Sequence, residues 1–231
     1  MKKFMLETKA ALGVAPKTVD VDFDEKAASL KTINSTLSDY KSAIERTRSA
    51  SESLVSAMES MRKVMETMAR GDDVPESVKS VVKDYTQLTQ KSQSEFLVDF
   101  KKTINEGEST ADITTLVGKC KRLEAKRNKV MSEYDAYRDS VSKKEETYRK
   151  KGKDLSDSKG YNEEVAKRDS LKAEFERIDK EFKEMYAELE KKKLHSYMHA
   201  ISIYLAGTSQ LMASIQKEME STKKKADTVK V

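Results

Sequence analysis

Apolar side chains recur along much of this chain at alternating steps of four and three residues. The first such row begins at Ile33 and reaches Met68 with no break in the spacing. These steps keep returning to one side of a helix and are typical of the packed seam of a coiled coil. They predict a long first helix whose seam is Ile33, Leu37, Tyr40, Ile44, Thr47, Ser51, Leu54, Met58, Met61, Met65 and Met68.

Two further rows predict two further helices. The second row is Ile113, Leu116, Cys120, Leu123, Arg127, Val130, Tyr134, Tyr137, Val141 and Tyr148. The third row begins as Leu171, Phe175, Ile178, Phe182, Met185 and Leu189. Three rows with the same helical period and no strand-like alternation predict an all-α fold, an elongated three-helix antiparallel coiled coil.

The scarce glycines and prolines place the ends of these helices. A leader occupies 1–21, and either Asp20 or Asp22 is suited to cap the N-terminus of the first helix. Gly107 interrupts the second helix and predicts a kink or a short loop. The three helices are expected at 22–71, 75–151 and 161–225 within one domain at 22–226, followed by a tail at 227–231.

The third row broadens after Leu189, and the broader part predicts self-association. Between Leu194 and Met219 the apolar positions cover more of the helix than two neighbours from the same chain can bury. A homodimer with a six-helix central bundle would cover them. The expected dimer interface contains Leu194, Met198, Ile201, Leu205, Leu211, Met212 and Ile215.

Composition supports long helices and a cytoplasmic protein. Of 231 residues, 37% are charged and 37% hydrophobic, which is too polar for a thick globular core. The single cysteine, Cys120, cannot form an internal disulfide. Residues 194–216 carry no formal charge but contain too many polar side chains for a membrane span, and Glu7 interrupts a signal-like start.

Positive charge is concentrated in one region. Residues 118–153 contain thirteen Lys or Arg and six acids, a balance of +7 that exceeds the +5 of the whole chain. Such a surface attracts anionic membranes, while solvated coiled-coil faces and nucleic acid are the alternatives. No base-reading motif accompanies the basic residues, so nucleic acid is not expected. Lys119, Arg122, Lys126 and Lys129 form one helical row, and Lys143, Lys144, Arg149, Lys150, Lys151, Lys153 and Lys159 lie toward the far tip.

The leader has a cationic amphipathic pattern. Phe4 and Met5 lie near one side of a short helix, and Lys2, Lys3 and Lys9 lie around the other. This pattern suits a segment that lies at a lipid interface, and a disordered or incidentally docked terminus is the alternative.

No pattern for catalysis or cofactor binding is present. His195 and His199 have a spacing compatible with a metal, but no third ligand can be identified, so we expect histidines buried in the dimer core. Cys120 is expected to be a small core residue. The sequence predicts no enzyme, no cofactor and no metal site.

These features together resemble the BAR domain family, specifically the N-BAR type of amphiphysin and endophilin. The resemblance rests on the amphipathic leader, the acidic run from Asp20 to Glu25, and three long helices with a basic second one. The stretch Lys121-Arg-Leu-Glu-Ala-Lys-Arg127, followed by Tyr134-Asp135, is similar to the family's basic run and Tyr-Asp pair. The Gly107 region departs from the family's second helix, and this departure bears on curvature.

The resemblance implies a crescent homodimer that senses or generates membrane curvature, for which endocytosis or vesicle trafficking is the family's commonest setting. The row at Lys119, Arg122, Lys126 and Lys129 would face anionic phospholipid, phosphatidylserine or phosphoinositide, on the concave side. The tip cations would also bind lipid, and Phe4 and Met5 would insert as a shallow wedge. A cytoplasmic, peripheral membrane protein is expected; the alternative is a structural or adaptor coiled coil that binds proteins and not lipid.

Overall fold

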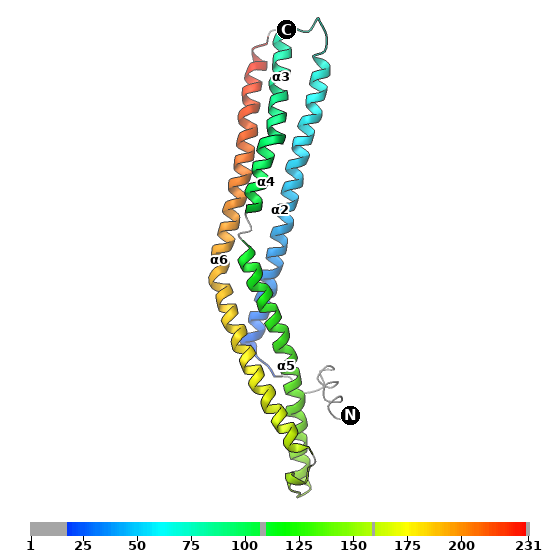
Figure 1. Ribbon diagram of the computed structural model, residues 1–231, viewed down its shortest axis with the longest axis vertical. Coiled ribbons are helices and arrows are strands. Elements are labelled where there is room, and N and C mark those ends of the chain that lie inside the picture. Colours follow the sequence, from blue (N-terminus) through cyan, green and yellow to red (C-terminus); the bar gives the residue numbers. More distant parts are fainter. Residues whose placement is uncertain (1–17, 107–109, 159, 230–231) are drawn as a thin grey trace. The chain divides into compact units, whose positions relative to one another are not determined.

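The computed structural model describes residues 18–106, 110–158 and 160–229. Every regular element in these residues is a helix, and the described chain contains no strand. The predictions for the leader and for Lys159 lie outside the described residues. The elements are α2 (Val21–Met68), α3 (Glu76–Lys91), the π-helical η1 (Ser92–Phe96), α4 (Leu97–Glu106), α5 (Ala111–Lys150), the 3-10 helix η3 (Leu155–Asp157) and α6 (Tyr161–Asp227) (Figure 1).

The chain divides into two units, each built from three helical segments. Unit 1 contains the described residues up to Asn34 together with Ile113–Lys192, and unit 2 contains Ser35–Asp112 and Lys193–Val231. The helices α2 and α6 contribute to both units. The third segment is α5 in unit 1, and α3 with α4 in unit 2.

The core of unit 1 follows the predicted rows of α5 and α6. Along α5 most of the predicted row is buried, with Val117, Asp135 and Ala136 buried beside it, and on α6 most of the first half of the predicted row is buried. Side chains of both rows pack on one another around Val130, Tyr137, Leu171 and Ile178. The predicted burial is confirmed at Ile113, Leu116, Cys120, Arg127, Val130, Tyr137 and Val141 on α5, and at Leu171, Ile178, Phe182 and Leu189 on α6.

Arg127 is the one charged member of these rows, and its side chain is completely buried. Its guanidinium forms ion pairs with Asp20 before α2 and with Asp179 on α6. The same group lies over the ring of Phe23, 3.5 Å from the centroid, and 4.7 Å from that of Phe175. A buried guanidinium is tolerated when it is paired and stacked in this way, so one side chain connects all three helical segments of unit 1.

The start of α2 is held to α5 at a second point. Asp20 is the residue, of the two predicted candidates, that caps α2: its Oδ1 accepts a hydrogen bond from the Phe23 backbone N–H at 3.1 Å. Thr18 donates from both its backbone N–H and its hydroxyl to the buried carboxylate of Asp135, at 2.8 and 2.7 Å. Arg138 completes this cluster by pairing with Asp135 at 3.0 Å. The first described residues therefore have a fixed position on α5.

In unit 2 the buried row of α2 departs from its predicted spacing. The buried positions follow the predicted spacing as far as Ser51. The next buried position is Val55, four residues further on, and it is 5% exposed. Leu54, the predicted position, is 40% exposed, and Met61 and Met68 are also exposed. Two successive steps of four bring the average closer to the 3.6 residues per turn of a straight helix. The prediction of an unbroken seam from Ile33 to Met68 is therefore wrong at Leu54, Met61 and Met68, although Met58 is buried as predicted and Met65 packs against the core.

The predicted second helix is divided into several elements. It consists of α3, η1 and α4, which follow one another directly, and of α5, which begins at Ala111. In η1 a wide π turn accommodates a step of five residues between the buried positions Ser92 and Leu97. The interruption predicted near Gly107 corresponds to the end of α4 at Glu106.

Unit 2 has its own core, in which α4 and α6 approach closely. The cluster includes Val55, Leu88, Phe100 and Leu211. Gly207 on α6 is buried against α4, and a Cβ at this position would lie 3.1 Å from Ile104 Cγ2 and 3.3 Å from Thr103 Cγ2. A larger residue would push the two helices apart.

Replacing Arg127 with Met should destabilise the protein by about 3 kcal/mol or more, because Asp20 and Asp179 would lose their buried partner. Burial tends to raise the pKa of Asp179, but the hydrogen bonds from Lys183 and Arg127 outweigh it, and the pKa lies below the usual 3.8. The ion pair between Arg127 and Asp179 therefore stabilises the fold above pH 3.8. This stabilisation is lost as the pH falls through the lowered pKa that Asp179 has in the folded state.

Urea unfolding followed by circular dichroism at neutral and acidic pH measures both effects. The R127M variant should unfold at lower urea and lose less stability on acidification than the parent chain. Equal midpoints at neutral pH would show that the network contributes nothing.

Two glycines in α-helices should respond oppositely to substitution. Gly207→Val should cost about 1–3 kcal/mol, because its side chain has no room beside α4. Gly118→Ala on α5 should stabilise by up to about 1 kcal/mol, because a Cβ there meets no atom within 4 Å and alanine favours the helix. Thermal and urea unfolding of both variants checks this prediction, and destabilisation by G118A would contradict it.

Candidate functional site: a basic row on α5 and an apolar face of unit 2

The predicted basic row lies on the surface of α5. Lys119, Arg122, Lys126 and Lys129 are all exposed and recur at steps of three and four residues. They therefore share one flank of the helix, beside the buried row that contains Cys120. Over ten residues of α-helix, at 1.5 Å each, the row is about 15 Å long.

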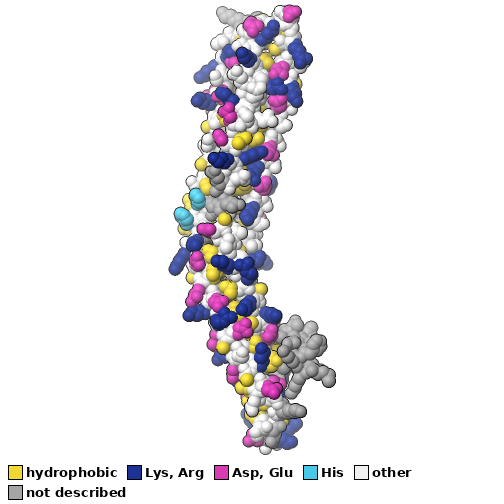
Figure 2. All heavy atoms as spheres, viewed as in Figure 1, with side chains coloured by type: hydrophobic (Ala, Val, Ile, Leu, Met, Phe, Trp, Pro, Cys, Tyr) yellow, Lys and Arg dark blue, Asp and Glu magenta, His cyan; other side chains and the backbone are white. Residues whose placement is uncertain are grey.

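The cations of this row differ from those of α6 in how they are paired. None of its four side chains forms an ion pair within the described residues. On α6 in the same unit, in contrast, many cations pair with acids of the same helix, mostly four residues away. These pairs are Lys172 with Glu176, Arg177 with Glu181, Lys180 with Glu184, Lys183 with Asp179 and Lys192 with Glu188. Dark blue and magenta side chains accordingly alternate over much of the face in Figure 2.

The tip cations fall into three groups. Lys143 and Lys150 are exposed but pair with acids of α5 at 2.7 Å, Asp139 and Glu146 respectively. Lys144 is only 15% exposed and pairs with the buried Glu164 of α6 at 2.8 Å. It therefore joins α5 to α6 and does not face outward as predicted. Arg149, Lys151 and Lys153 are exposed and pair with no described residue.

The turn between α5 and α6 has a defined backbone. Gly152, two residues beyond the end of α5, adopts a left-handed conformation with φ of 61°. Asp154 then accepts a hydrogen bond from the backbone N–H of Ser156 at 2.8 Å and starts η3. Tyr161, the first residue of α6, donates its hydroxyl proton to Glu145 at 2.7 Å. These contacts hold Lys151 and Lys153 on an ordered turn.

Most of the predicted dimer interface is exposed on α6 in unit 2. Leu194, Met198, Ile201, Leu205 and Met212 are between 47% and 69% exposed, and Met219 continues their row at 38%. Leu211 and Ile215 are different: they are 2% and 8% exposed and belong to the core of unit 2. The prediction assigned these two to a partner, but the chain buries them itself.

The exposed residues of α2 extend this apolar face. On α2, Glu52 and Glu66 face the α3–α4 segment, where they contact Lys101 and Thr86. Leu54 and Met68 each follow one of these glutamates by two residues, which is a rotation of about 200° around the helix. They therefore lie on the side of α2 turned away from α3 and α4.

The same argument places the α6 row on that side. Gly207 contacts α4, and Leu205 precedes it by two residues. We call the combined surface the α2–α6 face; its exposed residues are Leu54, Met61 and Met68 on α2 and Leu194, Met198, Ile201, Leu205, Met212 and Met219 on α6. The sequence alone does not indicate the α2 part, because Leu54 and Val55 are both apolar and only the structure shows that Val55 is the buried one.

The two histidines lie on the surface of the chain. His195 and His199 are both exposed on α6, and their rings are nearly parallel with centroids 6.4 Å apart. Figure 2 shows the two histidine side chains next to each other. Within the described residues no group of three or more His, Cys, Asp or Glu is arranged to hold a metal ion.

Cys120 lies fully inside unit 1, beneath the basic row. Burial raises the pKa of its thiol to about 11. The thiol therefore stays protonated at neutral pH and is a packing residue.

No family model matches the chain, and no curated protein matches it either. In the part of the chain that is described, no helix has both the length and the hydropathy to cross a bilayer, and this includes α6 around 194–216.

Proposed function

We propose that this chain is a BAR-type peripheral membrane protein: a crescent homodimer that binds anionic phospholipid and senses or generates membrane curvature. The observation that carries the proposal is the unneutralised basic row Lys119, Arg122, Lys126 and Lys129 on α5. An ordinary solvated helix face intersperses acids with its cations, as α6 does in the same unit. A row without such acids keeps its full attraction for a negative surface.

Simple energetics favour a dimer for this task. Each Lys or Arg near an anionic membrane contributes about 1 kcal/mol, so the row supplies about 4 kcal/mol per chain. That corresponds to a dissociation constant of only about 1 mM. Two chains that bind one membrane together would reach about 8 kcal/mol, or a dissociation constant of about 1 μM. Dimerisation would thus convert a marginal interaction into a useful one.

The α2–α6 face is the surface that we assign to the second copy. Its α6 residues follow steps of four, three, four, seven and seven from Leu194 to Met219, which is the pattern of a coiled-coil seam. A row that extends on both sides of Leu205 can pair with the same row of an antiparallel second copy. Exposed leucines and methionines in this number are unusual on the surface of a monomer.

Electrostatic lipid binding can be tested with a double charge reversal. Arg122→Glu with Lys126→Glu should strongly reduce cosedimentation with phosphatidylserine-rich liposomes, because two attractions become repulsions. The matched control, Lys172→Glu with Lys180→Glu, changes net charge equally but alters cations that α6 already neutralises. The parent chain should bind best at low salt, because exposed charges are screened beyond about 10 Å at 0.1 M salt.

Electron microscopy of the same liposomes would show whether binding deforms them. No binding at low salt, or equal losses in both double variants, would refute the lipid proposal. A stable dimer that ignores lipid would instead favour the structural or adaptor coiled coil.

Dimerisation can be tested separately with Leu205→Lys. In the dimer, a lysine at this position would be a buried and unpaired charge in each copy, which should cost about 3 kcal/mol or more in the free energy of dimerisation. The dissociation constant should therefore rise at least about a hundredfold. Val98→Lys is the control, because Val98 is similarly exposed, at 52%, but lies on α4. Sedimentation equilibrium measures the dissociation constants, and a monomeric parent chain or an unaffected L205K dimer would contradict the assignment.

A further inference from the structure

The exposed apolar residues of the α2–α6 face differ in kind from those elsewhere on the described chain. Five of the nine residues of this face are methionines, between 38% and 74% exposed: Met61, Met68, Met198, Met212 and Met219. The large aliphatic residues that are exposed outside the face, among the described residues, are all valines: Val19, Val21, Val64 and Val98. Every exposed methionine in the described part of the chain therefore lies on the surface that we assign to the second copy.

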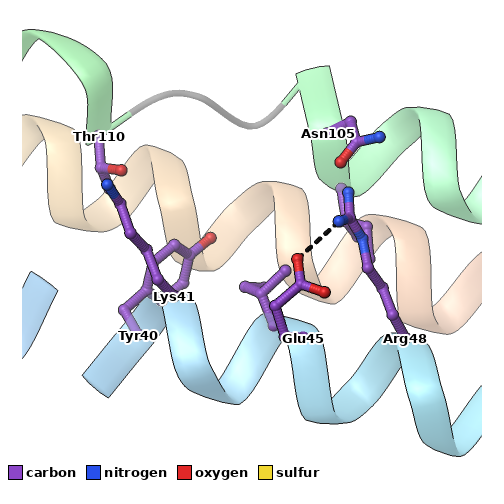
Figure 3. Close-up of a pocket in the computed structure, with 8 residues that line it drawn as sticks. Tyr40, Lys41, Glu45, Arg48, Asn105 and Thr110 are labelled. Atoms are coloured by element: carbon purple, nitrogen blue, oxygen red, sulfur yellow. Dashed lines mark hydrogen bonds and ion pairs between the residues drawn. The ribbon is translucent and has the colours of Figure 1, made fainter. Parts of the chain in front are cut away.

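The flank of α2 that faces α4 has a different chemistry. Its residues Lys41, Glu45, Arg48 and Glu52 follow steps of four, three and four. Figure 3 shows the first three directed from α2 toward the end of α4, with Arg48 donating to Glu45 at 2.7 Å. Glu52 pairs with Lys101 of α4. The concentration of methionine is thus a property of the α2–α6 face and not of α2 as a whole.

Exposure divides the methionines of unit 2 into two groups. Met58 lies three residues before Met61 on α2, but it is only 6% exposed and belongs to the core cluster. Met65 is half-buried and packs against the same cluster. A reagent in solution can therefore reach the sulfur atoms of the face in a separate chain, whereas the sulfur of Met58 is shielded.

Among aliphatic side chains, only the thioether of methionine is readily oxidised by peroxides. Hydrogen peroxide transfers one oxygen atom to the sulfur: the O–O bond breaks, an S–O bond forms and water leaves. The sulfur loses two electrons and the peroxide gains them. The product, methionine sulfoxide, is polar, and methionine sulfoxide reductases convert it back to the thioether. The reaction therefore changes an apolar position into a polar one reversibly.

We propose that the methionines of the α2–α6 face are sites of reversible oxidation by peroxide, and that their oxidation separates the two copies. This inference rests on the proposed function, because it takes the second copy as the molecule that covers the face. A sulfoxide in the interface would be a buried acceptor opposite an apolar row that offers no donor, and such a group is costly. Oxidation therefore favours separate chains. Conversely, dimerisation covers the sulfur atoms and slows their oxidation.

Peroxide treatment followed by sedimentation equilibrium tests the effect on assembly. Oxidation of the parent chain should raise the dissociation constant of the dimer at least about tenfold, because each copy then carries several polar sulfoxides. Treatment with a methionine sulfoxide reductase and its thiol reductant should restore the original value. Circular dichroism before and after oxidation would verify that the chain stays folded.

A pair of leucine variants separates the face from the other methionines. Met198→Leu with Met212→Leu should form a dimer of similar affinity, because leucine and methionine have similar volumes, and peroxide should weaken this dimer by a smaller factor. Met58→Leu with Met185→Leu is the matched control: Met58 lies in the core of unit 2 and Met185 is half-buried in unit 1, so the face is unchanged. This control should respond to peroxide as the parent chain does.

Mass spectrometry of the oxidised chain locates the modified sulfur atoms. Met198 and Met212 should oxidise faster than Met58 in dilute protein, and their rates should fall as the concentration rises above the dissociation constant of the dimer. The rate at Met185 should not change. Equal effects of peroxide on the M198L/M212L and parent dimers, or rates at Met198 and Met212 that ignore concentration, would overturn the proposal. A dimer that peroxide leaves intact would overturn this proposal alone, whereas a parent chain that stays monomeric would overturn the dimer as well.

Discussion

Unit 1 is organised around the burial of a single guanidinium. Arg127 occupies a position in the packed row of α5 where an apolar residue would ordinarily lie, and a charge in that place must be paired. Asp20 and Asp179 provide the pairing, and the rings of Phe23 and Phe175 lie close to the guanidinium. Because Asp20 also caps α2, the same contacts determine where that helix begins relative to α5 and α6. The unit thus gains a specific register that a purely apolar seam would leave less well defined.

The pairing of charges also distinguishes two groups of cations in unit 1. Arg127, Lys144 and Lys183 are engaged by carboxylates inside unit 1 and serve the fold. The basic row on α5 has no such carboxylate among the described residues. Two lysines of the same helix, Lys126 and Lys144, therefore have different surroundings: Lys126 is exposed, whereas Lys144 is paired with Glu164 of α6.

The predicted helices were largely right because a helical period is a local property. The steps of three and four along α5 follow from 3.6 residues per turn, and they identified most of its buried side chains from Ile113 to Val141, although not Val117, Asp135 and Ala136. The same steps failed at Leu54 in α2, because Leu54 and Val55 are both apolar and either could face the core. Neighbouring helices decide between them, because Val55 meets the cluster that includes Leu88 and Phe100. The π turn at Ser92–Phe96 was missed for a similar reason: its cause is the alignment of two packed faces.

The sequence by itself determined that this chain is helical, where most of its helices begin and end, and that positive charge accumulates on the segment that forms α5. Each of these follows from neighbours in the chain: periodic apolar residues, caps and local charge balance. Only the tertiary structure decided that Leu211 and Ile215 belong to the chain's own core, that Leu54 and Met68 are exposed, and that Lys144 is enclosed by Glu164. Those outcomes depend on contacts between residues far apart in sequence, which a helical period does not encode.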